Sequence, residues 1–363
     1  MTGLKWAILG TVGVPGNYGG FETLAENLVR LHGTGLPDTD LTVYCSRLAF
    51  KTHPTRYLTA NLRYIGLKAN GLQSVPYDVV SLFDAARRGT DVILLLGVSG
   101  ALALPFLRLF SRSRIVTNID GIEWKREKWR GLARWILRWS EWSAVRWSHA
   151  VIADNQAIAE HVRARYGVDC HVIAYGGDHA ISATPVTDPD LDLPQAFSLS
   201  LCRIEPENNV GVILEAFSKM PERNLVFVGN WDNSDYGKDL RKRYGACPNI
   251  TLLNPIYDPG RLREIRGRAT SYIHGHSAGG TNPSLVEMMH FGILIHAYDC
   301  SFNRYSTQGE ALYFKTSEEL IAAIRAVDAQ TTRAVGFAMQ QTARQLYLWD
   351  KIGRAYFALI RSI

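Results

Sequence analysis

The feature that most constrains this chain is an alternation of strands and helices that runs along it twice. Short apolar segments typical of buried strands alternate with helical segments up to about residue 174, and the alternation restarts at residue 197. In the first half we expect strands at 6–9, 41–45, 61–65, 92–96, 114–118, 149–153 and 171–174, and helices at 22–32, 75–86, 124–147 and 156–166. Such alternation is typical of a parallel sheet with helices on both faces. The sequence therefore predicts an α/β protein with doubly wound sheets.

The second half repeats this pattern after a segment with little periodicity. Residues 181–195 are rich in proline and aspartate, which indicates a linker. The 363 residues also exceed what one hydrophobic core usually serves. We expect strands at 197–201, 225–229, 250–253, 271–274 and 293–297, and a long helix over 333–360. The predicted domains are 1–180 and 196–340, and residues 341–363 are expected to pack back on the N-terminal domain.

Cysteine use and hydropathy indicate in which cellular compartment the protein is expected. The five cysteines are scattered and form no C-x-x-C pair, which disfavours a disulfide framework or structural zinc and fits a reducing cytoplasm. The N-terminus enters the first strand without a visible signal peptide. Residues 92–107 carry no charge and approach the length of a transmembrane helix. Gly97, Gly100 and Pro105 interrupt them, which favours a buried strand, a glycine turn and a short helix.

A glycine-rich loop, GTVGVPGNYGG, joins the first strand to the first helix and ends at Gly19 and Gly20. Glycines allow the backbone to approach a ligand, and a helix N-terminus favours an anion. The spacing is not G-x-G-x-x-G, so the dinucleotide fingerprint is not met. A tight strand-to-helix connection is the alternative.

A second loop of small and polar residues, HGHSAGGTNPSLVE, follows the strand at 271–274. Pro283 suits the first position of a helix, and the amides before it could bind an anion. Glu287, one turn later, could accept hydrogen bonds from ribose hydroxyls. The alternative is a carboxylate stabilised by the helix dipole. His274 and His276 lack a third ligand, so they do not predict a zinc site.

Two further strand ends carry charged residues. Arg203 follows the strand at 197–201 and suits a diphosphate through bidentate hydrogen bonds, although an ion pair with Glu205 or Glu207 is the alternative. Asp120 and Glu123 follow the strand at 114–118 and could bind acceptor hydroxyls. Acids in surface loops are common, so a role in solvation stays open.

The basic charge gathers in residues 124–147, which hold seven Lys or Arg against two Glu and six of the nine tryptophans. Along the expected helix, arginines recur every fourth residue beside a tryptophan stripe: Arg126, Arg130, Arg134 and Arg138, with Trp135, Trp139 and Trp142. This composition is typical of a helix at an anionic membrane surface. Nucleic-acid binding and a helix packed in the core are the alternatives. We favour the membrane and expect no nucleic-acid partner.

These motifs in this order resemble glycosyltransferase family 4, the retaining GT-B enzymes, over essentially the whole chain. The residues that carry the resemblance are GTVGVPGNYGGFETLAENLV, NIDGIEW, CRIEPENN and HGHSAGGTNPSLVE. More closely, the chain resembles a bacterial polysaccharide rhamnosyltransferase branch of that family. The resemblance implies a GT-B fold, in which two Rossmann-like domains face each other across a cleft.

The resemblance also implies roles for residues. Arg203 matches an arginine that binds the donor diphosphate, and Glu287 matches the second glutamate of a Glu-x7-Glu motif that holds the donor ribose. Tyr257 falls where the family lines the base pocket. The remaining predicted donor-site residues are Gly19, Gly20, Asn208, His276, Gly279, Gly280, Thr281 and Asn282. The chain departs from the family at two of these, because Gly279 replaces the first glutamate of the motif and Asn208 replaces a lysine. The family's acceptor-side histidine is absent, with Asp120 and Glu123 nearby.

The implied function is retaining, metal-independent transfer of a hexosyl group, L-rhamnose from dTDP-rhamnose, to a lipid-diphosphate-linked sugar in cell-surface polysaccharide synthesis. Arg203, Glu287 and Asp120 would be catalytic. No D-x-D pair of the metal-binding kind stands at a strand end, so we expect no required metal. The enzyme would lie on the inner face of the cytoplasmic membrane. The alternatives are a non-catalytic GT-B assembly subunit at the membrane, or a GT-B enzyme that uses another donor, such as a UDP- or GDP-sugar, or a soluble acceptor.

Overall fold

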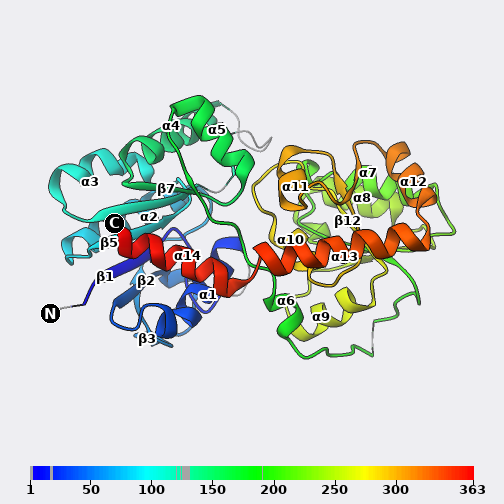
Figure 1. Cartoon of the computed structure of the whole chain (residues 1–363), viewed down its shortest axis with the longest axis horizontal. Helices are drawn as coiled ribbons and strands as arrows, with labels where there is room; N and C mark the ends of the chain where they lie inside the picture. Colours follow the sequence, from blue (N-terminus) through cyan, green and yellow to red (C-terminus); the bar gives the residue numbers. More distant parts are fainter. Residues whose placement is uncertain (1–2, 17–18, 120, 123, 125–130, 190) are drawn as a thin grey trace. The chain divides into compact units, whose positions relative to one another are not determined.

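The computed structural model describes residues 3–16, 19–119, 121–122, 124, 131–189 and 191–363. The chain forms two compact units (Figure 1). The first unit contains residues 1–174 and 350–363, and the second contains residues 175–349. The division therefore falls before the segment 181–195, in which the sequence analysis places the linker.

The first unit is built on an eight-stranded sheet in the part of the chain that the structure describes. The strand order is β3-β4-β2-β1-β5-β6-β7-β8, and all neighbours are parallel except β3 and β4. The strands are β1 (Lys5–Leu9), β2 (Asp40–Ser46), β3 (Arg56–Tyr57), β4 (Ala60–Ile65), β5 (Val92–Leu96), β6 (Arg114–Ile119), β7 (Ala150–Ala153) and β8 (His171–Val172). The chain leaves the central β1 first toward β2 and later toward β5, as a doubly wound sheet requires.

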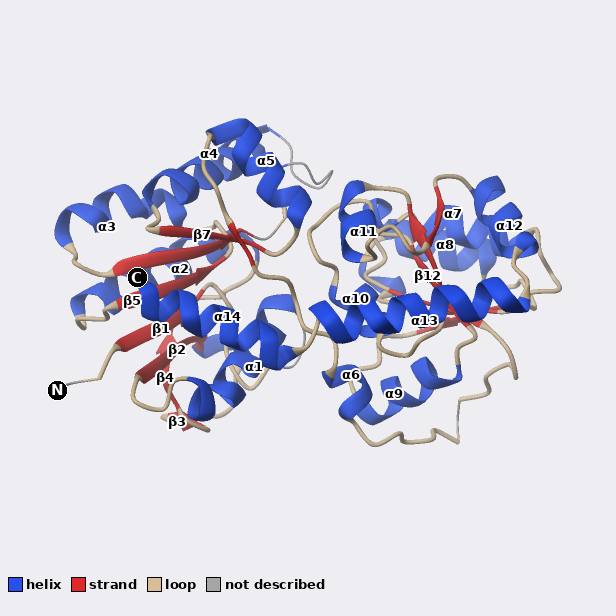
Figure 2. Ribbon diagram, viewed as in Figure 1, coloured by secondary structure: helices blue, strands red, loops and turns tan. Residues whose placement is uncertain are grey.

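Helices cover both faces of this sheet (Figure 2). They are α1 (Gly20–Gly35), α2 (Ser74–Arg87), α3 (Leu104–Phe110), α4 (Gly131–Trp147), α5 (Gln156–Tyr166) and α14 (Trp349–Ser362). The crossovers through α2, α3, α4 and α5 advance in one direction along the sheet, so right-handed connections place these four helices on one face. α1 advances the opposite way and lies on the other face, where Gly353 of α14 packs against Leu31.

The uncharged segment 92–107 contains β5, the short 3-10 turn Ala101–Ala103 and the start of α3. This is the strand, turn and short helix that the sequence analysis favours. Within the residues that the structure describes, no helix is long and apolar enough to cross a bilayer.

The second unit contains a six-stranded parallel sheet among the described residues, in the order β11-β10-β9-β12-β13-β14. The strands are β9 (Ser198–Leu201), β10 (Leu225–Val228), β11 (Ile250–Leu253), β12 (Ser271–His274), β13 (Leu294–Tyr298) and β14 (Leu312–Phe314). The order reverses between β9 and β12. Ligands of open α/β sheets bind at such a switch point, beyond the carboxyl ends of the strands.

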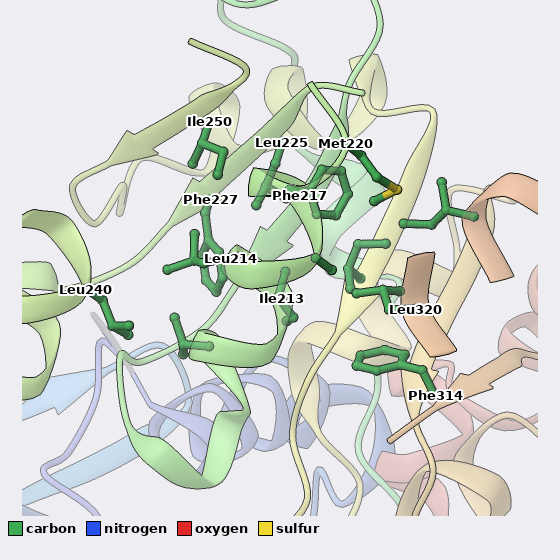
Figure 3. Close-up of a cluster of buried hydrophobic side chains, with 14 of the residues drawn as sticks. Ile213, Leu214, Phe217, Met220, Leu225, Phe227, Leu240, Ile250, Phe314 and Leu320 are labelled. Carbon is green, nitrogen blue, oxygen red and sulfur yellow. The ribbon is translucent and has the colours of Figure 1, made fainter. Parts of the chain in front are cut away.

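The helices of this unit are α6 (His179–Ser182), α7 (Val210–Ser218), α8 (Asp235–Tyr244), α9 (Pro259–Arg268), α10 (Pro283–Met289), α11 (Ser301–Ser306), α12 (Ser317–Ala326) and α13 (Ala329–Leu346). The core cluster in Figure 3 packs Leu214 and Phe217 of α7 against Leu225 and Phe227 of β10, all fully buried. This packing holds the start of α7, and with it the loop that follows β9.

The prediction of a single helix over 333–360 is wrong. The segment forms α13 and α14, and the chain turns at Tyr347, whose φ and ψ are −118° and 39°. The Tyr347 hydroxyl donates to the carbonyl of Ser306 at 2.7 Å, and its backbone carbonyl receives the amide of Gly177 at 2.8 Å. These tertiary contacts break the helix at a place where no proline or glycine marks an end.

Candidate active site

The loops after β9 and β12 are bound to each other at the switch point of the second sheet. Asn209 donates its side-chain amide to the carbonyl of Gly275 at 2.8 Å. The backbone amide and the hydroxyl of Ser277 both donate to the carbonyl of Glu207, at 3.0 and 2.8 Å. Two segments that the sequence analysis assigned separately to the donor site, CRIEPENN and HGHSAGGTNPSLVE, therefore lie side by side.

Asn208 braces the first of these loops. Its side chain is buried, and its amide nitrogen donates to the carbonyl of Arg203 at 2.7 Å. A side-chain amide at this position thus holds the backbone of the arginine that precedes the helix.

Arg203 is exposed at the tip of β9. One of its guanidinium nitrogens lies 3.8 Å from a carboxylate oxygen of Glu205, with 43% and 29% of the two side chains exposed. The ion pair that the sequence analysis kept as an alternative is therefore present, but it is long and solvated. Exposed pairs of this kind contribute roughly 0–1 kcal/mol. A diphosphate could replace Glu205 because it offers bidentate hydrogen bonds to the planar guanidinium.

Glu287 is buried and paired on both carboxylate oxygens. Oε2 binds the Arg266 guanidinium of α9, and Oε1 lies 3.2 Å from Nε2 of His179 on α6. Burial by itself raises the pKa of this carboxyl, but the charge of Arg266 and the hydrogen bond from His179 outweigh burial and lower the pKa to about 2. Glu287 is thus an ionised carboxylate, with lone pairs left for a further hydroxyl donor.

The loop between β12 and α10 combines a glycine at positive φ with a buried amide. Gly279 has a φ of +122°, a conformation that L-residues rarely adopt. Asn282, at the N-cap of α10, makes no side-chain capping bond. Its buried Nδ2 has no hydrogen-bond partner among the residues that the structure describes. Such a group costs about 1–3 kcal/mol unless something binds it, which makes it a candidate ligand contact.

Comparison with known protein families shows which family model the second unit matches. Residues 188–328 match the family model Glycosyl transferases group 1. The second unit is a glycosyltransferase group 1 domain. Residues 5–178 match a family model described as a domain of unknown function, DUF1972. A search of curated proteins finds no match.

Solved structures resemble the whole chain at low identity. Sucrose-phosphate synthase from Thermosynechococcus elongatus has a TM-score of 0.80 at 16% identity, over 99% of this chain and 98% of that one. Anabaena HepE in complex with UDP-glucose has a TM-score of 0.74 at 18% identity, over 99% of both chains. The lipopolysaccharide outer core galactosyltransferase WaaB has a TM-score of 0.67 at 15% identity, over 98% and 100%. These matches confirm the predicted fold class, GT-B with two Rossmann-like units.

Sequence reasoning missed three residues of the glycosyltransferase domain. Trp349 donates its indole N–H to Nδ1 of His179 at 2.9 Å, and its backbone amide donates to Asp178 at 2.8 Å. Because an indole nitrogen only donates, Nδ1 of His179 must accept, and Nε2 carries the proton given to Glu287. His179, Arg266 and Trp349 are far from Glu287 in the sequence. None of the three lies in a motif that the sequence analysis singled out.

His274 and His276 of the second unit stack on each other. The rings of His274 and His276 lie 4.4 Å apart with a 15° interplanar angle. Burial, and secondarily the charge of His276, lowers the pKa of His274 well below its ordinary value, so this ring is neutral. No group of three or more His, Cys, Asp or Glu side chains that could hold a metal occurs in the described part of the chain.

Other predicted donor-site residues have varied surroundings. Thr281 and Gly280 are buried in the loop before α10, whereas Tyr257 is 60% exposed after β11. In the first unit, α1 begins at Gly20, and Gly19 precedes it with a φ of +123°. The amides of the glycine-rich loop are partly occupied by the protein itself.

Two glutamates of α1 bind those loop amides. Glu22 accepts the amide of Val12 at 2.9 Å, and Glu26 accepts the amide of Gly16 at 3.2 Å. An anionic ligand at Gly19 and Gly20 would therefore compete with carboxylates of the chain.

Four predicted residues, Asp120, Glu123, Arg126 and Arg130, lie outside the described residues. The rest of the Trp/Arg stripe lies on α4. Trp135, Trp139 and Trp142 are 58%, 44% and 40% exposed, with ring centroids 5.6 and 5.4 Å apart in succession. Trp124, by contrast, is buried beneath the guanidinium groups of Arg134 and Arg138, at 5.8 and 5.6 Å.

Proposed function

We propose that the protein is a retaining glycosyltransferase that transfers L-rhamnose from dTDP-rhamnose to a lipid-diphosphate-linked saccharide. The observation that carries this proposal is the set of groups gathered beyond β9 and β12 in a glycosyltransferase group 1 domain. Exposed Arg203 suits a diphosphate, and ionised Glu287 suits a ribose. The side-chain amide of Asn282, which has no partner among the described residues, suits an oxygen of the donor sugar or of a phosphate.

In the proposed reaction the bond between the anomeric carbon and the diphosphate oxygen breaks. The acceptor hydroxyl attacks from the same face, and its proton passes to the departing phosphate. Arg203 and the amides before α10 stabilise the negative charge that develops on the leaving group. These groups supply cationic and amide donors without a metal ion, so we propose that none is required.

In this proposal the first unit binds both the acceptor and the membrane. Asp120 and Glu123 would bind acceptor hydroxyls. The exposed tryptophans and arginines of α4 would hold the enzyme at the inner face of the cytoplasmic membrane, where lipid-linked saccharides are found.

A UDP-sugar is the second candidate donor, because the similar HepE structure is a complex with UDP-glucose. A thermal-shift panel of dTDP-rhamnose, UDP-glucose, UDP-galactose, UDP-GlcNAc and GDP-mannose, together with the free nucleotides, separates the candidates. A ligand at a hundred times its dissociation constant adds about 2.7 kcal/mol of stability. If dTDP-rhamnose and dTDP stand out, the proposed donor holds, and if a UDP-sugar does, only the sugar is wrong. If none binds, the non-catalytic assembly subunit replaces the enzyme.

A further inference from the structure

The helix α3 is apolar on its exposed side as well as on its buried side. Leu104 and Leu107 are fully buried against the unit, as a packed helix requires. Phe106, Leu109 and Phe110 are nevertheless 62%, 75% and 83% exposed. A helix that is apolar all round is normally buried on all sides. The outer side of α3 therefore needs an apolar environment that the described chain does not supply.

This surface continues over the neighbouring helices. α2 lies beside α3, and α3 beside α4, on the same face of the sheet (Figure 1). Apart from Leu48, Leu58 and Val172, the exposed large apolar side chains described in the first unit all belong to this row. They are Val80, Phe83, Leu102, Phe106, Leu109, Phe110, Trp135, Trp139 and Trp142. Exposed apolar side chains on three neighbouring helices mark this face as a candidate interaction site.

The charges on the same helices and at their ends are mostly positive. The exposed arginines are Arg87, Arg88, Arg108, Arg112, Arg114, Arg134, Arg138 and Arg146. Among the acids of α2 and α4, Glu141 is buried, and Asp84 is paired with Arg63 and Arg88. Burial raises the pKa of Asp78 to about 8, which leaves that side chain mostly uncharged at neutral pH. The described part of this face is therefore basic.

A second copy of this chain is a poor partner for such a face. In a two-fold dimer the same patch meets itself, which would bring the arginines of both copies together. An anionic bilayer is complementary to it. Aliphatic and aromatic side chains enter the acyl region, tryptophans prefer the interface, and arginines reach phosphate groups with their stems on apolar surface.

We propose that α3 is the membrane-inserting element of this protein. Phe106, Leu109 and Phe110 enter the acyl region of an anionic bilayer, and Arg108 and Arg112, in the last turn of α3 and just after it, bind lipid phosphates. The inference rests on the proposed membrane location and extends it from α4 to α3, but it does not depend on the donor or on turnover.

Vesicle sedimentation of the full chain tests this. The vesicles contain phosphatidylcholine alone or with about one third phosphatidylglycerol. The test variant is Phe106→Ser with Leu109→Ser and Phe110→Ser. The matched control is Phe337→Ser, which removes a phenylalanine of α13 that is 66% exposed on the second unit. Because all four side chains are exposed, the variants should keep the melting temperature of the wild type.

We expect wild type and Phe337→Ser to bind the anionic vesicles equally. The triple variant should lose at least tenfold in partition coefficient, since three large apolar side chains no longer enter the acyl region. Vesicles without phosphatidylglycerol should bind the wild type at least tenfold more weakly.

Three results overturn the inference. The first is that the triple variant binds anionic vesicles within twofold of wild type. The second is that the wild type binds neutral and anionic vesicles equally well. The third is that the wild type does not bind vesicles and is a dimer, whereas the triple variant is a monomer. This face would then be a contact between copies of the chain. Vesicle binding through α3 without sugar transfer contradicts only the proposed function. Transfer to a lipid-linked acceptor by a protein that does not use α3 to bind vesicles contradicts only this inference.

Discussion

Nε2 of His179 donates to Oε1 of Glu287 over 3.2 Å, while Nδ1 of the same ring accepts the indole N–H of Trp349 over 2.9 Å. This imidazole thus links a side chain at the end of the second unit to the carboxylate that we propose binds the donor ribose. Since both ring nitrogens are used, the position of the ring and its tautomer are set together.

Replacing His179 by Phe should weaken nucleotide binding about tenfold, because Glu287 loses one hydrogen bond to a charged group, worth roughly 1.5–3 kcal/mol. The measurement is titration with the nucleotide identified in the thermal-shift panel. Trp349→Phe keeps the ring packing and removes only the N–H, so its effect should be smaller. Equal affinity of His179→Phe and wild type would show that His179 does not position Glu287 for the nucleotide.

Replacing Glu287 by Gln should cost about 3–5 kcal/mol of unfolding free energy, because the buried Arg266 guanidinium loses its counter-charge. Urea unfolding at neutral pH measures this loss. Glu205→Gln serves as the control, since its pair with Arg203 is long and solvated and should change stability by less than about 1 kcal/mol. A Glu287→Gln variant as stable as the control contradicts the prediction.

The pH dependence follows from the lowered pKa of Glu287, which is about 2 in the folded protein against an ordinary value of 4.5. Above pH 4.5 the carboxylate contributes its full stabilisation, and this is lost as the pH falls from about 4.5 toward 2, because the unfolded chain binds the proton first. Unfolding free energy measured across this window should fall less steeply for Glu287→Gln than for wild type.

His296 should make stability depend on pH in a different range. It is buried on β13, and burial lowers the pKa of its imidazole to about 4 from 6.5. The unfolded chain therefore takes up this proton first as the pH falls below about 6.5, so stability decreases down to about pH 4. His296→Leu should flatten that part of the curve. An unchanged slope between pH 6.5 and 4 would count against a neutral buried His296.

Arg203→Ala should lower kcat/KM by about 10²–10³-fold if the guanidinium stabilises the leaving diphosphate. Its melting temperature should match that of the wild type, because the side chain is exposed and its one described ion pair is weak. Steady-state kinetics with the identified donor and a calorimetric scan separate the two effects. Retained activity would remove Arg203 from the proposed mechanism.

Gly279→Ala tests the departure from the family pattern. An added Cβ would have room, with the nearest atom, of Asn282, 3.6 Å away, but the φ of +122° strains any L-residue. We expect a loss of about 1–3 kcal/mol in unfolding free energy. Gly309→Ala is a useful comparison, because its φ is +78° and its Cβ would also meet open space. If Gly279→Ala is as stable as the wild type, the loop can adopt another backbone conformation. A glutamate at position 279, as in the family pattern, would require such a change.

The sequence by itself determined most strands and helices of both sheets, though not β3 or β14, because burial on both faces leaves short apolar runs that are visible locally. It also placed Arg203 just after one strand and Glu287 in the helix that follows another, and the order of the motifs alone indicated GT-B. The GT-B fold is confirmed, while the donor, the acceptor and the roles of individual residues stay predictions.

Only the tertiary structure decided which side chains meet. Arg266 and His179 reach Glu287 from two other helices, and Tyr347 ends α13 through contacts that lie far away in the sequence. Hydropathy likewise showed that α3 is apolar but not that Phe106, Leu109 and Phe110 face outward. Periodicity reports the average environment of a segment, whereas partners and exposure depend on which distant segments pack beside it.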